Sequence, residues 1–484
     1  MKFTNTYIQL GQAFYQNIAP TPVKKPELQL FNSSLALRLG LDNELLSNKH
    51  LLAQYFSGNE LPPGAEPIAL AYAGHQFGQF NPHLGDGRAH LLGELLDDQN
   101  IRYDIQLKGS GPTHFSRQGD GRCALGPAIR EFIMSEAMHA LGVPTSRCLA
   151  VVTTGEQVAR NSYQPGAVVT RVATSHIRVG TFQFFAARSD LESLAALTDY
   201  AITRHFGDIN LTDDDKVVKF LEHVIDKQIA LVVSWLRVGF IHGVMNTDNT
   251  AISGETIDFG PCAMMGTYHK DTVFSSIDRN GRYAYGNQAK IAQWNMARLA
   301  EALLPLIDSE QDKAVALVEP LIHQFSEKFE QAYFAMYANK LGIEHYNDSD
   351  TELIVELLDI MQTKQLDYTQ TFNQLTDSLT QADIKNSMAT SLGDWYQTWL
   401  SRLQSLNSDM TQIQSLMRHS NPVVIPRNHH IENVLQQCEQ SGDFSSAEKI
   451  IKVLASPYAV IAETANYQDA ATDGDNSYQT FCGT

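Results

Sequence analysis

The chain has 484 residues, 43% of them apolar and 19% charged, which is enough to bury a large core and excludes intrinsic disorder as its general state. Its formal net charge of −18 argues against general binding to the phosphate backbone of nucleic acids. The longest mainly apolar run, residues 229–236, is far below the roughly 20 residues of a bilayer-spanning helix, and the N-terminal residues contain no apolar signal segment. We therefore expect neither a nucleic-acid nor a membrane partner.

The five cysteines are sparse and show no CxxC spacing. An odd number of scattered cysteines in a long chain indicates reduced thiols rather than a disulfide framework. We therefore expect the protein to be cytoplasmic. Cys123 and Cys148 are expected to be small, buried apolar residues.

The N-terminal third predicts a small β-rich unit. Residues 1–60 form an irregular lead-in interrupted by prolines, and four β-like runs follow, at 89–95, 103–107, 149–154 and 167–172. One helix interrupts these runs: Pro127 stands at a plausible first helical position, apolar residues recur on one face, and Gly142 ends the pattern. We expect a mainly antiparallel sheet with one key helix.

The rest of the chain has mostly helical spacing. Helices are expected after about residue 189, a loop-rich segment follows at 242–287, and further helices continue to about residue 463. The predicted fold class is α+β, with a smaller N-terminal β lobe and a larger helical lobe. The predicted divisions are 1–172 for the extension and β lobe, 173–463 for the helical lobe, and 464–484 for a flexible polar tail.

The loop-rich segment has the outline of a kinase catalytic loop followed by a DFG turn. His242, Asn249 and Asp258 match the pattern in type and order, but Val244 stands where a kinase carries its catalytic aspartate. Asn249 and Asp258 offer the oxygen ligands that Mg²⁺ prefers. Asp248 is the other carboxylate of the catalytic loop and becomes the candidate base. Taken separately, these short motifs are equally compatible with an ordinary polar turn and a strand end.

Two further residues complete a kinase-like order along the chain. Lys108 ends an alternating strand, and Glu131 lies near the start of the predicted helix, as expected for a lysine that contacts phosphates and a glutamate that positions it. Two GDGR segments, at 85–88 and 119–122, add glycines that let backbone amides approach phosphate. Arg171 and Arg178 add cations, so the pattern favours a polyphosphate ligand.

The combination of these motifs resembles the selenoprotein O family (SelO, also called YdiU). The resemblance rests on long segments spread over most of the chain: AYAGHQFGQFNPHLGDGRAHLLGE at 71–94, DIQLKGSGPTHFSRQGDGRCALGPAIREF at 104–132, VVTRVATSHIRVGTFQFF at 168–185, GFIHGVMNTDN at 239–249, IDFGPCAMM at 257–265 and NPVVIPRNHHIE at 421–432. It implies a protein-kinase-like, two-lobed pseudokinase fold. It also implies a protein adenylyltransferase, which binds ATP in an inverted orientation and transfers AMP to Ser, Thr or Tyr hydroxyls of proteins.

The resemblance also implies roles for individual residues. Asp248 would accept the proton, Glu131 would position Lys108, and Asn249 and Asp258 would bind Mg²⁺ or Mn²⁺. The nucleotide-binding residues implied are Gly85, Gly87, Arg88, Lys108, Asp120, Gly121, Arg171, Arg178 and Asp258. The alternatives are UMP transfer with Mn²⁺, a phosphotransferase acting on a small molecule, and a nucleotide-binding pseudokinase scaffold without activity.

Two other features are given structural or regulatory interpretations. Cys482 matches the C-terminal cysteine of the family, and a redox-sensitive pairing with Cys262 is a hypothesis. His429 and His430 are adjacent, and adjacent side chains of a helix or strand point in different directions. We therefore expect a structural or surface role rather than a metal site.

Overall fold

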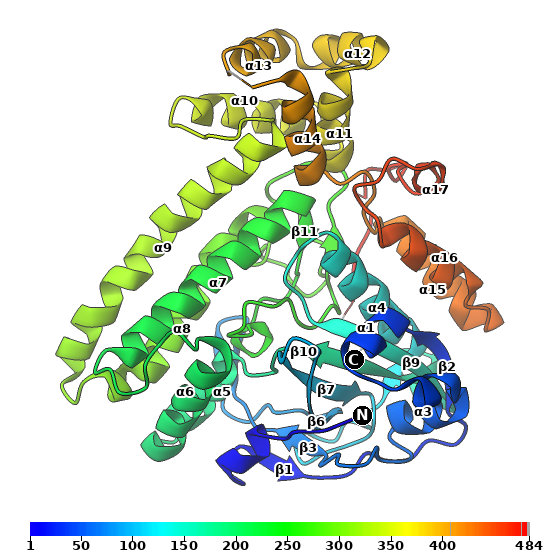
Figure 1. The fold of residues 1–484 in the computed structure, drawn as a ribbon, viewed down its shortest axis with the longest axis vertical. Coiled ribbons are helices and arrows are strands. Elements are labelled where there is room, and N and C mark those ends of the chain that lie inside the picture. The colour runs from blue at the N-terminus through cyan, green and yellow to red at the C-terminus, as the bar shows by residue number, and fades with distance from the viewer. Residues whose placement is uncertain (407, 476, 482–484) are drawn as a thin grey trace.

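The computed structural model describes residues 1–406, 408–475 and 477–481 (Figure 1). Its main sheet is antiparallel throughout, with the strand order β1-β3-β6-β7-β10-β9-β2, and β8 pairs with β10. The strands of this sheet are β1 (Tyr15–Asn17), β2 (Glu27–Phe31), β3 (Ile68–Leu70), β6 (Ala89–Leu96), β7 (Arg102–Lys108), β8 (Cys123–Ala124), β9 (Arg147–Ala159) and β10 (Tyr163–Ala173).

The four predicted β runs are confirmed as β6, β7, β9 and β10. The lead-in is more regular than expected, since β1 lies at one edge of the sheet and β2 at the other. These strands have three and five residues, too few for an alternating pattern to stand out, and their partners lie far along the chain. The first 31 residues therefore supply the strands at both edges of the sheet.

Helix α4 (Leu125–Ala140) covers one face of the sheet, and three short helices cover the other. The expected helix is confirmed, but it begins at Leu125, so Pro127 is its third residue and not its first. Pro127 still lies in the first turn, where a missing N–H costs no intrahelical hydrogen bond. The helices on the opposite face are α1 (Ser33–Arg38), α2 (Asn43–Ser47) and α3 (Lys49–Ser57).

The sheet contributes to two apolar cores because its side chains alternate between faces. Val151 and Val169 pack in the core that contains Ile129 of α4, whereas the neighbouring Val152 packs with Phe56 of α3. All of these side chains are at most a few per cent exposed. The sheet is thus buried on both faces, which fixes the ends of β7 and β10, where the candidate site lies.

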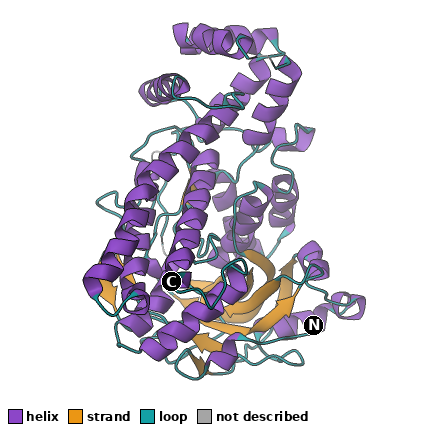
Figure 2. Cartoon of the chain, turned by 60° about the vertical axis from the view of Figure 1, so that its left-hand side comes forward, coloured by secondary structure: helices purple, strands orange, loops and turns teal. Residues whose placement is uncertain are grey.

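The remainder of the described chain is mainly helical, as Figure 2 shows. Helices begin at α5 rather than after residue 189. The bounds are α5 (Val179–Ala186), α6 (Leu191–His205), α7 (Lys216–Val238), α8 (Gln288–Ile307), α9 (Gln311–Lys340), α10 (Asp350–Thr363), α11 (Tyr368–Ser378), α12 (Ala382–Leu392), α13 (Asp394–Gln404), α14 (Met410–Ser420), α15 (Asn428–Ser441), α16 (Ser445–Leu454) and α17 (Ala462–Ala465).

The loop-rich segment between α7 and α8 contains little regular structure, as expected. It includes the two-stranded pair β11 (Phe240–Ile241) and β12 (Ala263–Met264) and two short 3₁₀ helices, η2 (Thr247–Asn249) and η3 (Tyr285–Asn287). A separate hairpin of β4 (Gly74–Gln76) and β5 (Gln79–Asn81) packs against η2 and α5. Among the described residues, no helix is both long and apolar enough to cross a membrane.

The described part of the C-terminal segment contacts the rest of the protein. Thr480 forms a bridge with Ser275, and its hydroxyl donates to the Pro261 carbonyl oxygen at 2.7 Å. The Tyr478 hydroxyl donates to the Glu432 carboxylate at 2.7 Å. We expected a flexible tail over 464–484, yet these contacts place residues 478–480 against the loop that follows Asp258. The three predicted divisions of the chain stay predictions.

Candidate active site

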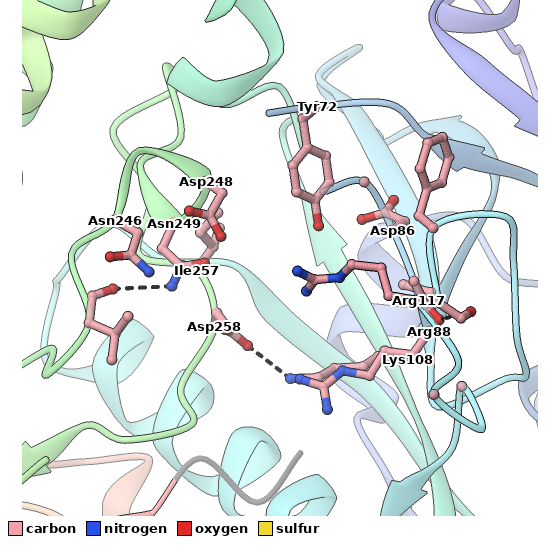
Figure 3. Close-up of a pocket in the computed structure, with 18 of the residues that line it drawn as sticks. Tyr72, Asp86, Arg88, Lys108, Arg117, Asn246, Asp248, Asn249, Ile257 and Asp258 are labelled. Carbon is pink, nitrogen blue, oxygen red and sulfur yellow. Dashed lines mark hydrogen bonds and ion pairs between the residues drawn. The ribbon is translucent and has the colours of Figure 1, made fainter. Parts of the chain in front are cut away.

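A pocket of about 1070 Å³ lies between the ends of the sheet and the loop that follows α7 (Figure 3). Figure 3 shows two facing groups of side chains, which we call the sheet wall and the loop wall. The sheet wall comprises Tyr72, Asp86, Arg88, Lys108 and Arg117, and we include Arg171 of β10, the strand paired with β7. The loop wall comprises Asn246, Asp248, Asn249, Ile257 and Asp258, and we include Val244 of the same loop.

The structure brings the predicted site residues together. All but one line this pocket: Gly85, Gly87, Arg88, Lys108, Asp120, Gly121, Arg171, Arg178, Asp248, Asn249 and Asp258. The exception is Glu131, which lies on α4 and contacts the pocket-lining Lys108 and Arg171. Residues separated by 150 positions in the sequence therefore share one site.

Lys108, Glu131, Arg171 and Asp258 form one network of charges. Lys108 Nζ lies 2.7 Å from Glu131 Oε2 and 2.9 Å from Asp258 Oδ1. Arg171 Nη2 lies 2.9 Å from the same Asp258 oxygen, and its Nε donates to Glu131. Lys108 and Arg171 come from the neighbouring strands β7 and β10, and Glu131 comes from the helix packed on them. Two cations of the sheet thus contact one carboxylate of the helix packed on it and one carboxylate of the loop wall.

The network keeps both carboxylates ionised. Burial alone would raise the pKa of Asp258, but Lys108 and Arg171 outweigh burial and hold that pKa well below its usual range. Burial likewise opposes ionisation of Glu131, and Arg171 and Lys108 lower its pKa. The network therefore presents fixed, compensated charges, as required of a site that binds a polyanion and a cation together.

His242 holds the segment that precedes Asp258. Its Nε2 donates to the Ile257 carbonyl oxygen at 2.9 Å, while its Nδ1 accepts from the Val244 backbone N–H at 3.3 Å. Burial lowers the pKa of His242, which fits a neutral ring with one donor and one acceptor nitrogen. Asp258 itself has a φ of +65°, an uncommon conformation for a residue other than glycine. His242 therefore braces the catalytic loop against the turn that carries Asp258.

Asp248 is buried with an incomplete set of hydrogen bonds. Its Oδ2 accepts from Gln76 Nε2 at 3.2 Å, and its Oδ1 has no partner among the described residues. Burial raises the pKa of Asp248 to about 6, and neither Gln76 nor Arg178 offsets this. A partly compensated carboxylate with a raised pKa is the arrangement expected of a proton acceptor.

Asn249 and Asp258 have free oxygen atoms suited to a divalent cation. Asn249 Nδ2 donates to the Val244 carbonyl oxygen at 3.1 Å, which fixes the amide and leaves its Oδ1 available. Asp258 uses Oδ1 for both cations, so Oδ2 is left for a further ligand. An amide oxygen and a carboxylate oxygen form a hard donor set, which fits Mg²⁺ or Mn²⁺. The remaining ligands of such an ion would be water and phosphate oxygens.

Arg178 differs from the cations that face the pocket freely. Its guanidinium donates to the Asp248 carbonyl oxygen at 3.1 Å, stacks on the Tyr72 ring at 4.2 Å, and lies 3.9 Å from the Asp86 carboxylate. By contrast, no ion pair joins Arg88 or Arg117 to a carboxylate within the described part of the chain. Arg178 therefore ties the loop wall to the sheet wall, while Arg88 and Arg117 are available to a ligand.

The two GDGR segments have different surroundings. In the first, a Cβ on Gly85 would lie 2.3 Å from the Phe115 ring, so glycine permits the turn to pack against that ring. In the second, a Cβ on Gly121 would lie 2.1 Å from the Gly111 backbone. Asp120 is exposed and forms an ion pair with Arg160 at 2.8 Å. Both segments line the pocket, but Asp120 lies at its solvent-facing margin.

Sequence reasoning missed four polar or aromatic residues of the site. Asp86 is buried and accepts from Gln106 Nε2 at 3.0 Å, Tyr72 stacks under Arg178, Gln76 contacts Asp248, and Arg117 projects into the pocket. Gln76 and Asp248 are 172 positions apart, so no local spacing connects them. Arg117 belongs to a glycine-rich loop, which is the sequence signal for this residue. The structure adds that its backbone φ is +48°.

Comparison with known proteins identifies the relatives of this chain. The model of the family described as "Protein adenylyltransferase SelO" matches residues 1–455. The chain belongs to the SelO family. It is 52% identical to "Protein nucleotidyltransferase YdiU" of Teredinibacter turnerae, with all of both chains covered. Proteins with the same name from Rhizobium etli and Bacillus thuringiensis are 51% and 49% identical, covering 100% and 99% of this chain and 97% and 98% of their own.

The structure of this SelO-family member describes only one cysteine of the hypothesised Cys262–Cys482 pair. Cys123, Cys148, Cys262 and Cys438 are buried free thiols, which confirms the expectation for the first two. Burial raises the pKa of Cys262 to about 11. Cys482 lies outside the described residues, although Thr480 contacts Pro261, the neighbour of Cys262. The pairing stays a prediction.

His429 and His430 contact the same carboxylate. Their Nε2 atoms lie 3.3 Å and 2.7 Å from the two carboxylate oxygens of Asp469. All three groups lie within 4.8 Å of one another, which is also compatible with a bound metal ion. The structural role remains our interpretation, because these contacts join α15 to the C-terminal segment.

Proposed function

We propose that this protein transfers AMP from ATP to Ser, Thr or Tyr hydroxyls of protein acceptors and releases pyrophosphate. As a SelO-family member, it is a protein nucleotidyltransferase. The observation that carries the proposal is the presence in one pocket of the Lys108–Glu131–Arg171–Asp258 network and the buried Asp248. The network suits a metal-bound triphosphate, and Asp248 suits removal of a proton.

We also propose a kinase-like, two-lobed fold for the chain. An antiparallel sheet with α4 packed on it supplies the lysine and glutamate, and a mainly helical part supplies the two loops with Asn249 and Asp258. This order of elements supports the proposal, since a protein kinase uses the same order for its strand lysine, helix glutamate and metal ligands.

The residue roles follow from charge and position. Arg88, Lys108 and Arg171 would neutralise the phosphates, and Glu131 would hold Lys108 and Arg171 in place. The glycines Gly85, Gly87 and Gly121 would let the backbone approach the ligand, with Asp120 and Arg178 fixing the surrounding loops. Charge neutralisation of the leaving group is the main electrostatic demand of such a transfer.

The proposed step is a single displacement at the α-phosphorus of ATP. The acceptor hydroxyl oxygen forms a bond to that phosphorus, the bond from phosphorus to the bridging oxygen of the β-phosphate breaks, and pyrophosphate departs. The hydroxyl proton moves to the carboxylate of Asp248, which lines the pocket. Asn249 and Asp258 would hold a divalent cation, Mg²⁺ or Mn²⁺, which would supply charge neutralisation at the phosphates.

Val244 argues against ordinary phosphate transfer. A valine at this position cannot accept a proton from a substrate at the γ-phosphate, as the catalytic aspartate of a kinase does. A small-molecule phosphotransferase is therefore disfavoured, and a scaffold without activity would not need the partly compensated Asp248. UMP transfer with Mn²⁺ differs only in the base and the ion, and no residue of the pocket excludes it.

The test is mass spectrometry of the purified protein and added lysate proteins after incubation with ATP and Mg²⁺. Modified peptides are expected to gain the mass of AMP. A gain equal to phosphate would contradict the proposal, and ATP binding without any modification would favour the scaffold. Parallel reactions with UTP and with Mn²⁺ decide the nucleotide and the metal.

A further inference from the structure

The turn of the β4–β5 hairpin contains Phe77, a residue type that the backbone conformation of this turn does not favour. Gln76 pairs with Gln79, so Phe77 and Gly78 form a two-residue turn, and both have positive φ, +51° and +84°. A turn of this kind favours Asn-Gly, and a bulky aromatic residue in the left-handed region is uncommon. Phe77 is nevertheless 38% exposed. Its side chain, rather than its backbone preference, must account for its place at the turn.

The hairpin is fixed on the loop wall beside Asp248. The backbone N–H of His75 donates to Thr247 Oγ1 at 2.6 Å, and that of Phe77 donates to Asn246 Oδ1 at 3.0 Å. Between them, Gln76 donates to the Asp248 carboxylate. Three consecutive residues of the hairpin thus bind three consecutive residues of the catalytic loop, and the Phe77 ring is held at a defined distance from the proposed base.

An apolar rim lies where an acceptor would approach. Phe77 and Ile277 line the same pocket as Asp248, and Ile277 is 48% exposed. The Phe77 ring lies 5.2 Å from the Tyr283 ring, so only part of its surface is covered. The phosphate-binding cations lie on the opposite, sheet wall. Exposed apolar side chains beside the proton acceptor, and away from these cations, suit the acceptor rather than the triphosphate.

An arginine without an ion pair lines the same pocket. Arg117 projects into the pocket from the sheet wall, and no ion pair joins it to a carboxylate within the described residues. Because the whole chain has a net charge of −18, an unpaired arginine at this opening is a local exception. Its guanidinium is complementary to an acidic group on the bound segment.

We propose that the rim formed by Phe77 and Ile277 is the acceptor-binding surface, and that together with Arg117 it selects a protein segment in which the hydroxyl residue has a large apolar neighbour and a nearby acidic residue. This inference rests on the proposed function and adds the chemistry of its acceptor. The hairpin then serves both sides of the transfer, since Gln76 orients the Asp248 carboxylate while Phe77 contacts the acceptor.

The test begins with immobilised peptides that carry one hydroxyl residue and varied neighbours, incubated with Mg²⁺ and ATP labelled on the α-phosphate. The wild-type protein should label peptides with Phe, Leu or Ile beside the hydroxyl residue, and more strongly when Asp or Glu is nearby. Equal labelling whatever the neighbours would overturn the acceptor inference alone. Absence of label from every peptide and lysate protein would overturn the proposed function itself.

The decisive variant is Phe77→Asn, because asparagine is favoured at this turn position and the hairpin keeps its conformation. We expect the KM for the best peptide to rise about tenfold, with kcat nearly unchanged, as for the loss of one apolar anchor. Ile277→Ser should act in the same direction. The matched control is Phe80→Ser: Phe80 is an exposed aromatic residue of the same hairpin, packs on His75 at 5.0 Å, and does not line the pocket.

A binding measurement separates acceptor from nucleotide. The Kd for ATP, measured by calorimetry, should be the same for the wild type, Phe77→Asn and Phe80→Ser. A weaker Kd for ATP in Phe77→Asn would place the nucleotide on the rim and overturn the inference. An unchanged KM for peptides in both Phe77→Asn and Ile277→Ser would overturn it as well.

Discussion

Two regions of the pocket hold carboxylates whose pKa values are shifted in opposite directions. In the charge network, Lys108 and Arg171 contact Glu131 and Asp258, and the pKa of each carboxylate is lowered. Outside this network, Asp248 is buried, but Gln76 is the one side chain that donates to it among the described residues, and its pKa rises to about 6. Removal from water opposes ionisation of all three carboxylates, so the partners decide whether a carboxylate holds charge or accepts a proton.

Removing Asp258 should have the largest effect on activity. Asp258→Ala takes away a proposed metal ligand and the shared partner of Lys108 and Arg171, so we expect AMP transfer to fall at least about a thousandfold. The measurement is the initial rate with saturating ATP and Mg²⁺. Asp469→Ala, which alters an exposed aspartate outside the pocket, is the control. Full transfer by Asp258→Ala would refute the assigned site.

Replacing Glu131 tests whether the charge network depends on compensation between its cations and carboxylates. Glu131→Ala leaves the buried Lys108 and Arg171 with a single carboxylate, and we expect the free energy of unfolding to fall by about 3–5 kcal/mol. Activity should fall about a hundredfold, because Lys108 loses its positioning contact. Chemical denaturation and initial rates measure the two effects. Unchanged stability would show that solvent reaches the network and compensates the cations.

Replacing Asp248 should raise the free energy of unfolding, whereas replacing Glu131 should lower it. Asp248→Asn keeps the shape but removes a buried, partly compensated charge, so we expect a gain of about 1–3 kcal/mol at pH 7 in metal-free buffer. A raised folded-state pKa means that ionisation destabilises the fold above pH 6, so this gain should disappear as the pH falls toward 4. Transfer should fall about a hundredfold and leave residual activity. A loss of stability at pH 7 would contradict the contrast between Asp248 and the carboxylates of the network.

Asp120 should give the smallest effect. Its carboxylate is exposed and already forms an ion pair with Arg160, so Asp120→Ala should alter the loop at the pocket margin and little else. We expect the KM for ATP to rise about threefold, which corresponds to less than 1 kcal/mol. Steady-state kinetics with varied ATP are sufficient. A loss as large as that of Asp258→Ala would move Asp120 from the margin into the centre of the site.

The sequence predicted those parts of the site that have a local pattern of their own. The strand that ends at Lys108, the helix that carries Glu131 and the loop from His242 to Asn249 each have a local pattern, and the structure brings them into one pocket. Alternating or helical periodicity decides such elements, and their order along the chain is enough to suggest how they meet.

The contacts that adjust Asp248 could not be predicted in the same way. Gln76 lies in a three-residue strand, and nothing in its neighbours indicates that it reaches a carboxylate 172 positions away. The strands β1 and β2 were missed for a related reason, since short edge strands are defined by their partners rather than by their own pattern. Local periodicity has no information on either kind of long-range pairing.

The position of β1 and β2 has a consequence for synthesis of the chain. Residues 15–31 contain both edge strands of the sheet, and β2 pairs with β9, which ends at Ala159. During synthesis, β1 can pair once β3 has emerged, but β2 must wait, unpaired, until β9 follows more than a hundred residues later. A shortened N-terminus would leave both edges of the finished sheet open, and open edges invite pairing with strands of other molecules.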